Sequence, residues 1–506
     1  MNTADFPLTD PDAVDRLGDD LRAAGYDSEQ VPARLGPSAH RALGRDEFVP
    51  ALRATRSAAP LDTLIRLFLL GSTESHAEVA RALPRSTVAG AAAAGVLESA
   101  GDGWRAALDI RPHADDDSEY LVVSDLDSDA RPGPVRPDHV LGIGQASLTL
   151  AAAVIRAPVD AVLDLGTGCG IQALHCGGQA RSVTATDTNP RALALAAATA
   201  RLNGQHWELL RGSLFEPVPD RRFDLVVSNP PFVIGAGEQR YEYRDSGMAG
   251  DRLCARLVRE LPGHLTEGGT GQLLANWLVR ENTDWRDRVA EWLAGTGCDA
   301  WVVQRELADP AEYVALWGKD AGEDPAAGAA IAERWLDYFA AERVAGIGMG
   351  LITMRRNGSA IPDIVLDDLP GAGEEVTGVE AAAFLARRGW LRDTDDTALL
   401  GTRLAVGAGV WLEQRALPGP LGWEPVLRML RRAGGPGATL QVDEWGQTLL
   451  AGCTGAAPLA VVIRLLAEAH ELDPDPLTAA VLPSVREAIT RGLLHPVTDP
   501  DPDQSR

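Results

Sequence analysis

Between Val159 and Arg356 the chain alternates short apolar runs with longer segments of helical periodicity. The apolar runs have the length and composition of buried strands. This alternation predicts a mostly parallel sheet with helices on both faces. The expected strands are AVLDLG, SVTATD, WELLRG, FDLVVSN, GQLLANW, DAWVVQRE and GIGMGLITMRR. Two further helical stretches separate the last two strands, so we expect these strands to pair in antiparallel fashion around an insertion.

The segment before this sheet has a different pattern. Residues 1–60 are polar helical segments interrupted by Pro and Gly. Residues 61–135 give three short helices, a glycine and a hairpin, and then a strand, YLVVSDL, after the acidic stretch HADDDSEY. The order helix, helix, helix, hairpin is that of a winged helix, so we predict a helical segment over 1–60 and a winged-helix-like module over 61–135.

The pattern changes again past Pro362. Helical and strand-like segments mix over 359–496, which predicts a separate α/β module, and we expect the polar end, 497–506, to be disordered. The spacing from Thr87 to Gly95 recurs between Ser484 and Gly492, each time before two apolar residues. This could be an echo of one helix-and-wing unit, but any helix that ends at a glycine gives the same pattern, and we favour that simpler interpretation.

Composition narrows the class of protein. A chain of 506 residues is long enough for about three or four domains. Its net charge of −25 disfavours a broad contact with nucleic-acid backbone. The five cysteines form no Cys-x-x-Cys pair, which disfavours disulfides and a zinc site and indicates a reduced, cytoplasmic setting. The amino terminus is too polar for a signal peptide, and no apolar run is long enough to span a membrane.

The strongest chemical signal is the glycine-rich turn in VLDLGTGCG, between a strand and a helix. Its glycines allow a tight turn and let a ligand approach backbone N–H groups at the start of the helix. The spacing is tighter than G-x-G-x-x-G, and the strand ends in an acid, which favours a cationic amino-acid ligand over a diphosphate. The candidate residues are Asp164, Gly166, Thr167, Gly168, Cys169 and Gly170.

The second strand also ends in an acid, Asp187, at an offset that suits hydrogen bonds to ribose hydroxyls. Thr188 and Asn189 follow it. Asn189 can cap the next helix, with Pro190 at the first helical position. The two strand ends together predict a nucleoside-containing ligand at one edge of the sheet.

DLGTGCG, ATDTNP and SNPPF, in this order and spacing, resemble class I S-adenosylmethionine-dependent methyltransferases of the amino-methylating branch. That branch includes glutamine methyltransferases of release factors, guanine methyltransferases of ribosomal RNA, and adenine methylases. The resemblance covers about residues 138–356. It implies a Rossmann-like methyltransferase domain over 136–358, with a mostly parallel sheet, an antiparallel last strand and S-adenosylmethionine as cofactor.

The resemblance also implies roles for single residues. The three loop glycines would pass under the methionine part of the cofactor, and Asp187 would hold its ribose. The segment RGSLFEP matches the loop that touches the adenine, which adds Ser213 and Leu214 to the expected contacts. Ser213 stands where the family usually has Asp, and its hydroxyl would hold the adenine amine more weakly. Tyr241 and Glu242, in the loop after SNPPF, and Gln145, before the sheet, are expected near the substrate; Ser147 is a possible contact, although a plain helix cap explains both Gln145 and Ser147 equally well.

Asn229-Pro230-Pro231-Phe232 stops the fourth strand abruptly, because neither proline can donate a ladder hydrogen bond. A planar amide or aryl amine is a weak nucleophile, since its lone pair is delocalised. The Asn229 side-chain oxygen and the Pro230 carbonyl can accept the two NH₂ hydrogens and direct that lone pair. Pro231 lacks an N–H that would compete for the Pro230 carbonyl, and Phe232 offers a surface for stacking. A turn that only ends a strand is the alternative, which the position in the sheet disfavours.

We therefore predict an S-adenosylmethionine-dependent N-methyltransferase that acts on a planar nitrogen of RNA, DNA or a protein glutamine. A small metabolite as acceptor is the alternative. A non-catalytic winged-helix protein that merely keeps the cofactor fold is less consistent with the intact motifs. We expect no metal; His175 and Cys176, in the helix after the glycine loop, are interpreted as core residues.

Overall fold

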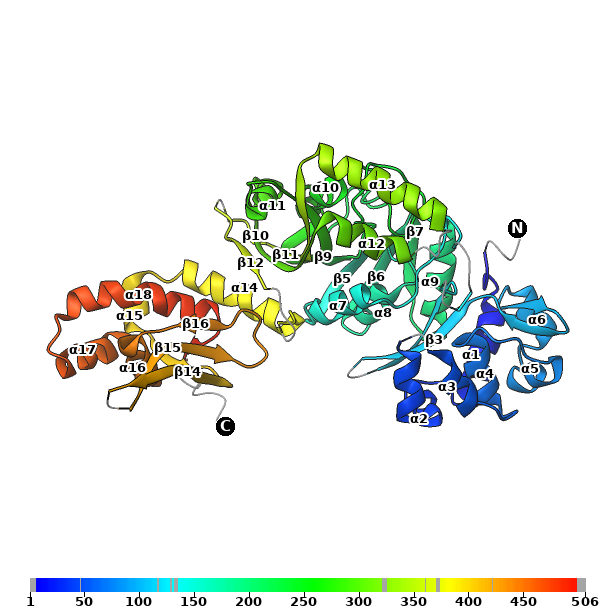
Figure 1. Ribbon diagram of the computed structural model, residues 1–506, viewed down its shortest axis with the longest axis horizontal. Helices are drawn as coiled ribbons and strands as arrows, with labels where there is room; N and C mark the ends of the chain where they lie inside the picture. The colour runs from blue at the N-terminus through cyan, green and yellow to red at the C-terminus, as the bar shows by residue number, and fades with distance from the viewer. Residues whose placement is uncertain are drawn as a thin grey trace. The chain divides into compact units, whose positions relative to one another are not determined.

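The computed structural model describes residues 6–45, 47–115, 118–127, 130–131, 135–320, 325–359, 361–369, 374–420 and 422–497. The chain divides into two compact units, residues 1–366 and 367–506 (Figure 1). Beyond Val497, the predicted disordered tail lies outside the described residues.

The first unit is built around one large sheet. Over the described residues its strand order is β12-β10-β11-β9-β8-β5-β6-β7. The strands are β5 (Val159–Leu165), β6 (Ala180–Asp187), β7 (Trp207–Arg211), β8 (Phe223–Ser228), β9 (Leu265–Arg280), β10 (Cys298–Ala308), β11 (Val344–Arg356) and β12 (Ile364–Asp368). Strands β7, β6, β5, β8 and β9 run parallel. Strand β11 pairs antiparallel with both β9 and β10, which confirms the expected direction of the last strand. Strand β12 was not predicted.

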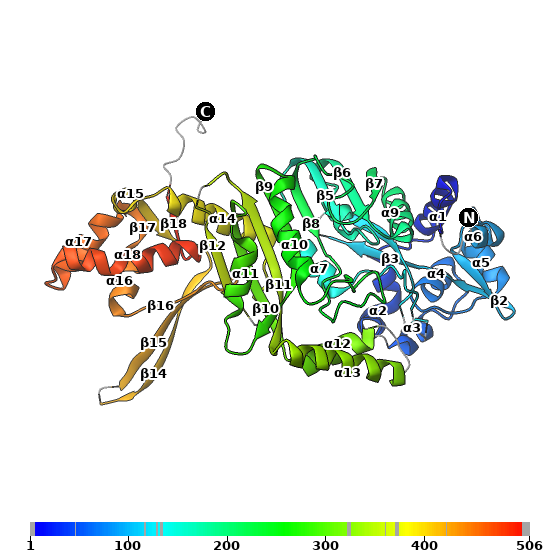
Figure 2. The same ribbon diagram turned by 90° about the horizontal axis from the view of Figure 1, so that it is seen from above.

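Helices flank the sheet, and their apolar residues belong to separate hydrophobic cores. They are α7 (Gln145–Ala153), α8 (Ile171–Cys176), α9 (Pro190–Leu202), α10 (Arg252–Glu260), η1 (Leu261–His264), α11 (Trp285–Leu293), α12 (Pro310–Asp320) and α13 (Pro325–Ala341). Apolar residues of α10, η1 and α11 share a core with β8 and β9. Those of α8 and α9 share a core with the amino-terminal segment. Helices α12 and α13 lie side by side in the connection between β10 and β11 (Figure 2), where the sequence predicted a helical insertion.

The amino-terminal segment combines helices with two antiparallel strand pairs, in which strand β3 was not predicted. It contains α1 (Pro11–Ala23), α2 (Gln30–Leu43), α3 (Phe48–Ala54), α4 (Pro60–Phe68), α5 (His76–Ala82), α6 (Val88–Ala93), β1 (Leu97–Ala100), β2 (Gly103–Ala106), β3 (Asp109–Ala114) and β4 (Glu119–Ser124). Its apolar side chains continue into those of α8 and α9 without a break. The segment therefore packs against α8 and α9, the helices that follow β5 and β6.

The second unit has its own core and mixes helices with small antiparallel sheets, as expected. Its elements are α14 (Gly378–Arg392), α15 (Asp396–Gly401), β13 (Arg403–Val406), β14 (Val410–Gly419), β15 (Gly422–Arg432), β16 (Thr439–Gln441), α16 (Glu444–Gly452), β17 (Thr454–Pro458), α17 (Leu459–Ala469), α18 (Pro474–Thr490) and β18 (Leu494–Pro496). One sheet has the order β17-β13-β18 and another β14-β15-β16.

Candidate active site

A cavity of about 440 Å³ lies where β5, β6, β7 and β8 end. The carboxyl ends of parallel strands meet at one edge, and the direction of chain progression reverses between β5 and β8, which is where α/β sheets bind ligands. The predicted site residues that line this cavity are Ser147, Gly166, Thr167, Gly168, Cys169, Asp187, Thr188, Asn189, Ser213, Leu214, Asn229, Pro230, Pro231 and Glu242. Motifs that are far apart in the sequence therefore line the same cavity.

The glycine loop adopts a backbone that other residues rarely reach. Gly166, Gly168 and Gly170 have φ angles of 75°, 55° and 88°. A Cβ on Gly166 or Gly168 would meet nothing within 4 Å, so the space above these two positions is open to a ligand. A Cβ on Gly170 would lie 2.6 Å from the Trp207 ring. Gly170 differs from the expectation, because it is not among the lining residues and instead packs closely against Trp207.

Asp164 also differs from the expectation, because it is not among the residues that line the cavity. Its Oδ2 accepts hydrogen bonds from Thr167 Oγ1 at 2.6 Å and from the Ala173 backbone N–H at 3.0 Å. The side chain is 1% exposed, and this burial raises the pKa of the carboxyl to about 6. Asp164 thus positions the glycine loop and the start of α8 instead of facing a cationic ligand.

Asp187 lines the cavity and is tied to the glycine loop. Its Oδ2 accepts the Gly168 N–H at 2.9 Å, and its Oδ1 accepts the Asn189 N–H at 2.9 Å. Burial raises the pKa of this carboxyl, and the backbone donors counteract the shift. The Asn189 Oδ1 accepts the Arg191 N–H at 2.9 Å and caps α9 as predicted, while its Nδ2 donates to Asp138 O at 3.0 Å. Hydrogen bonds therefore fix the end of β6 to the glycine loop and to the start of α9.

The Asn-Pro-Pro turn follows β8 and is anchored through Ser228, the last residue of that strand, and Asn229. Ser228 Oγ donates to Leu165 O at 2.8 Å, across the neighbouring strand. Asn229 Nδ2 donates to Ser147 Oγ at 3.2 Å. This contact uses one N–H of the Asn229 amide and leaves the amide oxygen available to a ligand.

The rest of the turn corrects two expectations. The Pro230 carbonyl accepts the Phe232 N–H at 2.7 Å, so Pro231 does not keep competing donors away from it. A carbonyl oxygen has a second lone pair, and Pro230 still lines the cavity. Phe232 is not among the lining residues; its ring makes an edge contact with Trp317 at a centroid distance of 6.2 Å. Phe232 is therefore an anchor of the turn and not a platform in the cavity.

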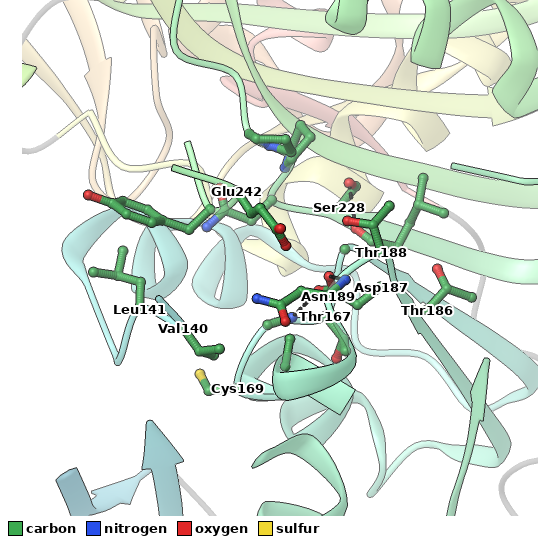
Figure 3. A pocket seen from close by; sticks show the side chains of 18 of the residues that line it. Val140, Leu141, Thr167, Cys169, Thr186, Asp187, Thr188, Asn189, Ser228 and Glu242 are labelled. Atoms are coloured by element: carbon green, nitrogen blue, oxygen red, sulfur yellow. Dashed lines mark hydrogen bonds between the residues drawn. The ribbon is translucent and has the colours of Figure 1, made fainter. Parts of the chain in front are cut away.

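The loop after this turn closes one side of the cavity. Val233 forms a bridge with Asp245, and the Glu242 N–H donates to Pro137 O at 3.0 Å. The Glu242 side chain lines the cavity and faces the group that contains Thr167, Asp187 and Asn189 (Figure 3). Partial burial raises its pKa, and the charges of Asp138 and Asp187 add to this shift.

Two of the expected substrate contacts lie elsewhere. Tyr241 is buried beneath the Arg244 guanidinium and is not among the lining residues. Gln145 is exposed at the start of α7 and does not line the cavity either. The position of Tyr241 and Gln145 in the sequence does not determine whether their side chains face the cavity.

Sequence reasoning missed several lining residues. Those from the segment before α7 and from the loop after the turn are His139, Val140, Leu141, Gly142, Gln239, Tyr243, Asp245 and Ser246. Val140 and Leu141 form one side of the pocket in Figure 3. The resemblance had indicated both segments, but their irregular backbone has no periodicity from which the inward side chains could be read.

Among the described residues, no group of three or more His, Cys, Asp or Glu side chains is arranged to hold a metal ion. His175 and Cys176 are buried, and the His175 Nε2 lies 2.9 Å from the His113 Nε2. The helices within the described part of the chain are all too short or too polar to cross a membrane.

Three families match parts of this chain. Residues 142–283 match the methyltransferase small domain. Residues 23–107 and 382–496 match two domains of unknown function, DUF7059 and DUF7782. The methyltransferase match covers the strands and turns that build the cavity.

Individual relatives agree with this match. The release factor glutamine methyltransferase of Geobacter sulfurreducens is 33% identical over 185 residues, which is 34% of this chain and 63% of that protein. The ribosomal protein uL3 glutamine methyltransferase of Bradyrhizobium diazoefficiens is 36% identical over 124 residues, 22% of this chain and 39% of that protein. The chain thus spans less than two thirds of the length of these relatives.

A solved structure, the 16S rRNA N2 G1207 methyltransferase of T. thermophilus in complex with AdoMet and guanosine, is 18% identical with a TM-score of 0.26; the match covers 42% of this chain and 62% of that one. The sheet, the glycine loop and the family match define a class I methyltransferase domain. Residues 142–283 match the model of the methyltransferase small domain, and the two relatives compared above are glutamine methyltransferases.

Proposed function

We propose that the protein is an S-adenosylmethionine-dependent N-methyltransferase that methylates a glutamine side chain of a macromolecule. One observation carries the proposal: Asn229 and Pro230 line the same cavity as the glycine loop and Asp187. Acceptors for an NH₂ group thus lie beside a site suited to a nucleoside cofactor. Such adjacency is the requirement for direct transfer between two bound molecules.

The residues present fit the cofactor. The cavity volume lies within the range of small-molecule sites, and the open space above Gly166 and Gly168 leaves room for the methionine part. Asp187 would accept hydrogen bonds from the ribose hydroxyls, and Ser213 and Leu214 would border the adenine. When bound, the cofactor supplies an electrophilic methyl group on a sulfonium.

The chain itself would orient the acceptor. Asn229 Oδ1 and the second lone pair of the Pro230 carbonyl would accept the two hydrogens of a planar NH₂ group, which leaves the nitrogen lone pair directed at the methyl group. The fixed φ of proline and the Ser147 contact hold both acceptors in place. No general base is required at the moment of transfer, because the product can lose its proton afterwards.

A protein amide is favoured over a nucleic-acid base for three reasons. The compared relatives are glutamine methyltransferases of a release factor and of a ribosomal protein. In addition, Phe232 packs against Trp317, so it does not offer the stacking surface that a base would use. The net charge of −25 also disfavours broad contact with nucleic acid.

We further propose that residues 61–135 include a winged-helix-like module and that the flanking modules position a large substrate in the cytoplasm. Glu74, between α4 and α5, bridges to Trp104 on β2, which gives the strand order Glu74, β2, β1. In the second unit β17, between α16 and α17, and β18, after α18, both pair with β13. The same arrangement of helices and strands would then occur twice. The middle strand comes last in the first set, as β2, and first in the second set, as β13. This favours the interpretation that the spacings before Gly95 and Gly492 reflect one repeated helix-and-wing unit.

The Asn229→Ala variant tests the proposed chemistry. Labelled methyl transfer should be measured on ribosomes, protein extract, total RNA and metabolites, and cofactor affinity by calorimetry. We expect Asn229→Ala to lower the transfer rate by roughly 10²–10³-fold, because one preorganised acceptor is lost, with cofactor affinity nearly unchanged. Ser213→Ala is the matched variant, expected to weaken cofactor binding with little effect on the maximal rate. Label confined to RNA or to metabolites, or full turnover by Asn229→Ala, would contradict the proposal.

A further inference from the structure

We propose that the helical pair α12–α13 is the supporting wall of the acceptor side of the cavity, and that Tyr313 and Arg244 are the positioning residues that connect it to the two segments lining that side. The inference rests on the proposed function. The inference adds to that function a role for an insertion that carries none of the recognised motifs, and for residues that do not line the cavity.

Tyr313 connects three elements through one hydroxyl group. The residue belongs to α12 and is completely buried. Its Oη accepts the Ile234 backbone N–H at 2.9 Å and the Asn276 Nδ2 at 2.9 Å. Ile234 is the second residue after the Asn-Pro-Pro-Phe turn, and Asn276 lies on β9. The turn is thereby held between the insertion and the sheet.

Aromatic packing reinforces this hydroxyl contact. The Tyr313 ring lies 6.2 Å from Trp317, 6.5 Å from Trp335 and 6.2 Å from Phe339, measured between centroids. Phe232 joins the same cluster through Trp317. Gly235 lies so close to Trp335 that a Cβ there would be 3.2 Å from the indole. The four residues after Pro231 thus pack against α12 and α13.

Arg244 connects the same wall to the second lining segment. It is 4% exposed, and its Nη1 donates to Trp317 O, near the end of α12, at 2.8 Å. Its Nε lies 3.3 Å from Asp245 Oδ1, and its guanidinium stands over the Tyr241 ring at 4.8 Å. Its own carbonyl accepts the Val233 N–H at 3.1 Å, which joins this segment to the first.

The two connected segments supply the acceptor side of the cavity. Pro230 and Pro231 come from the first, and Glu242, Tyr243 and Asp245 from the second. The glycine loop and Asp187 stand instead on β5 and β6, whose neighbours are α8 and α9. A defect in the α12–α13 wall should therefore misplace the acceptor while the cofactor side keeps its geometry.

Tyr313→Phe tests this separation. The variant keeps the ring packing but leaves the Ile234 N–H and the Asn276 amide without the hydroxyl oxygen. We expect kcat for methyl transfer to fall roughly 10- to 100-fold, since small displacements of reacting groups have effects of this size. Affinity for S-adenosylmethionine should stay within about twofold of wild type, and the structure should stay folded by circular dichroism.

Tyr26→Phe is the matched control. Tyr26 is also buried, at 1% exposure, and its hydroxyl donates to Ile110 O at 2.7 Å, in the amino-terminal segment. The Tyr26→Phe variant should have a lower free energy of unfolding, as Tyr313→Phe does, but keep the wild-type kcat. If Tyr313→Phe does not fold, Arg244→Lys makes the same test, because it keeps the positive charge beside Asp245 and removes the fork that reaches Trp317 O.

The outcomes separate this inference from the proposed function. Wild-type kcat in folded Tyr313→Phe or Arg244→Lys overturns the inference and leaves the proposed function intact. An equal loss of cofactor affinity and kcat also overturns it, because the defect would then not be confined to the acceptor side. A wild-type protein that binds the cofactor but transfers no methyl group to any macromolecule defeats the proposed function, and the inference falls with it.

Discussion

At the scale of residues, the site depends on carboxylates that bind the backbone. Asp164 and Asp187 hold the glycine loop from two strands, through Thr167, Ala173 and Gly168. One of these carboxylates lines the cavity, and the other lies behind it. Two Asp residues near the ends of neighbouring strands therefore have different functions, because one is enclosed by the loop and the other is next to open space.

Asp164 should make stability depend on pH. Its folded pKa of about 6 lies above the ordinary value of 3.8, so the folded protein holds this proton more tightly than the unfolded chain. The contribution of the group to stability is complete below about pH 4 and is lost as pH rises through 6. The free energy of unfolding of Asp164→Asn, measured in urea, should therefore increase relative to that of wild type between pH 4 and 7, by up to about 3 kcal/mol. A difference that does not change with pH would contradict this assignment.

At the scale of elements, α9 connects the amino-terminal segment to the site. Asn203, at the end of α9, accepts the Leu121 N–H at 2.9 Å and donates to Leu121 O at 2.8 Å, which pairs it with β4. Arg191, at the start of α9, forms a buried ion pair with Asp125 beyond β4. The helix that Asn189 caps beside the cavity is thus fixed at both ends to the amino-terminal segment.

Asn203→Ala should destabilise the protein by about 1–3 kcal/mol, since it leaves the N–H and C=O of Leu121 without their partner. The midpoint of urea unfolding, with the slope of the transition unchanged, measures this effect. Gln414→Ala is a suitable control, because it removes only an exposed amide contact with Gln447, and it should change stability by less than about 0.5 kcal/mol. Equal effects of the two variants would show that the contact with β4 contributes little.

At the scale of the whole molecule, the chain forms two compact units, and the cavity belongs to the first. Each unit has a hydrophobic core of its own. Separate cores of this kind favour separate unfolding transitions. A ligand that binds only one unit stabilises that unit alone by mass action.

Calorimetry should therefore resolve two transitions. S-adenosylmethionine at 100 times its dissociation constant should stabilise the transition of residues 1–366 by about 2.7 kcal/mol and leave that of residues 367–506 in place. A single transition, or an equal shift of both, would show that the two units unfold as one.

Much of the architecture was predictable from local pattern. Apolar runs predicted strands β5 to β11, because strands buried on both faces are continuously apolar over a short segment. Motif spacing predicted the strand ends that meet at the cavity, because the φ requirements of Gly and Pro act within a few residues. Strand β12 and strand β3 were missed. β12 is short and half-buried, and β3 carries polar residues, so neither has a strong period.

The sequence by itself determined the class of fold, the glycine loop, the acid at the end of β6 and the Asn-Pro-Pro turn. Only the tertiary structure decided which side chains reach the cavity: Asp187 but not Asp164, Pro230 but not Phe232, Glu242 but not Tyr241. It also decided that Tyr313, about 80 residues further along the chain, holds the turn. The reason is physical: local motifs set the backbone conformation, whereas the direction of a side chain depends on what packs beside it, and those neighbours come from distant segments.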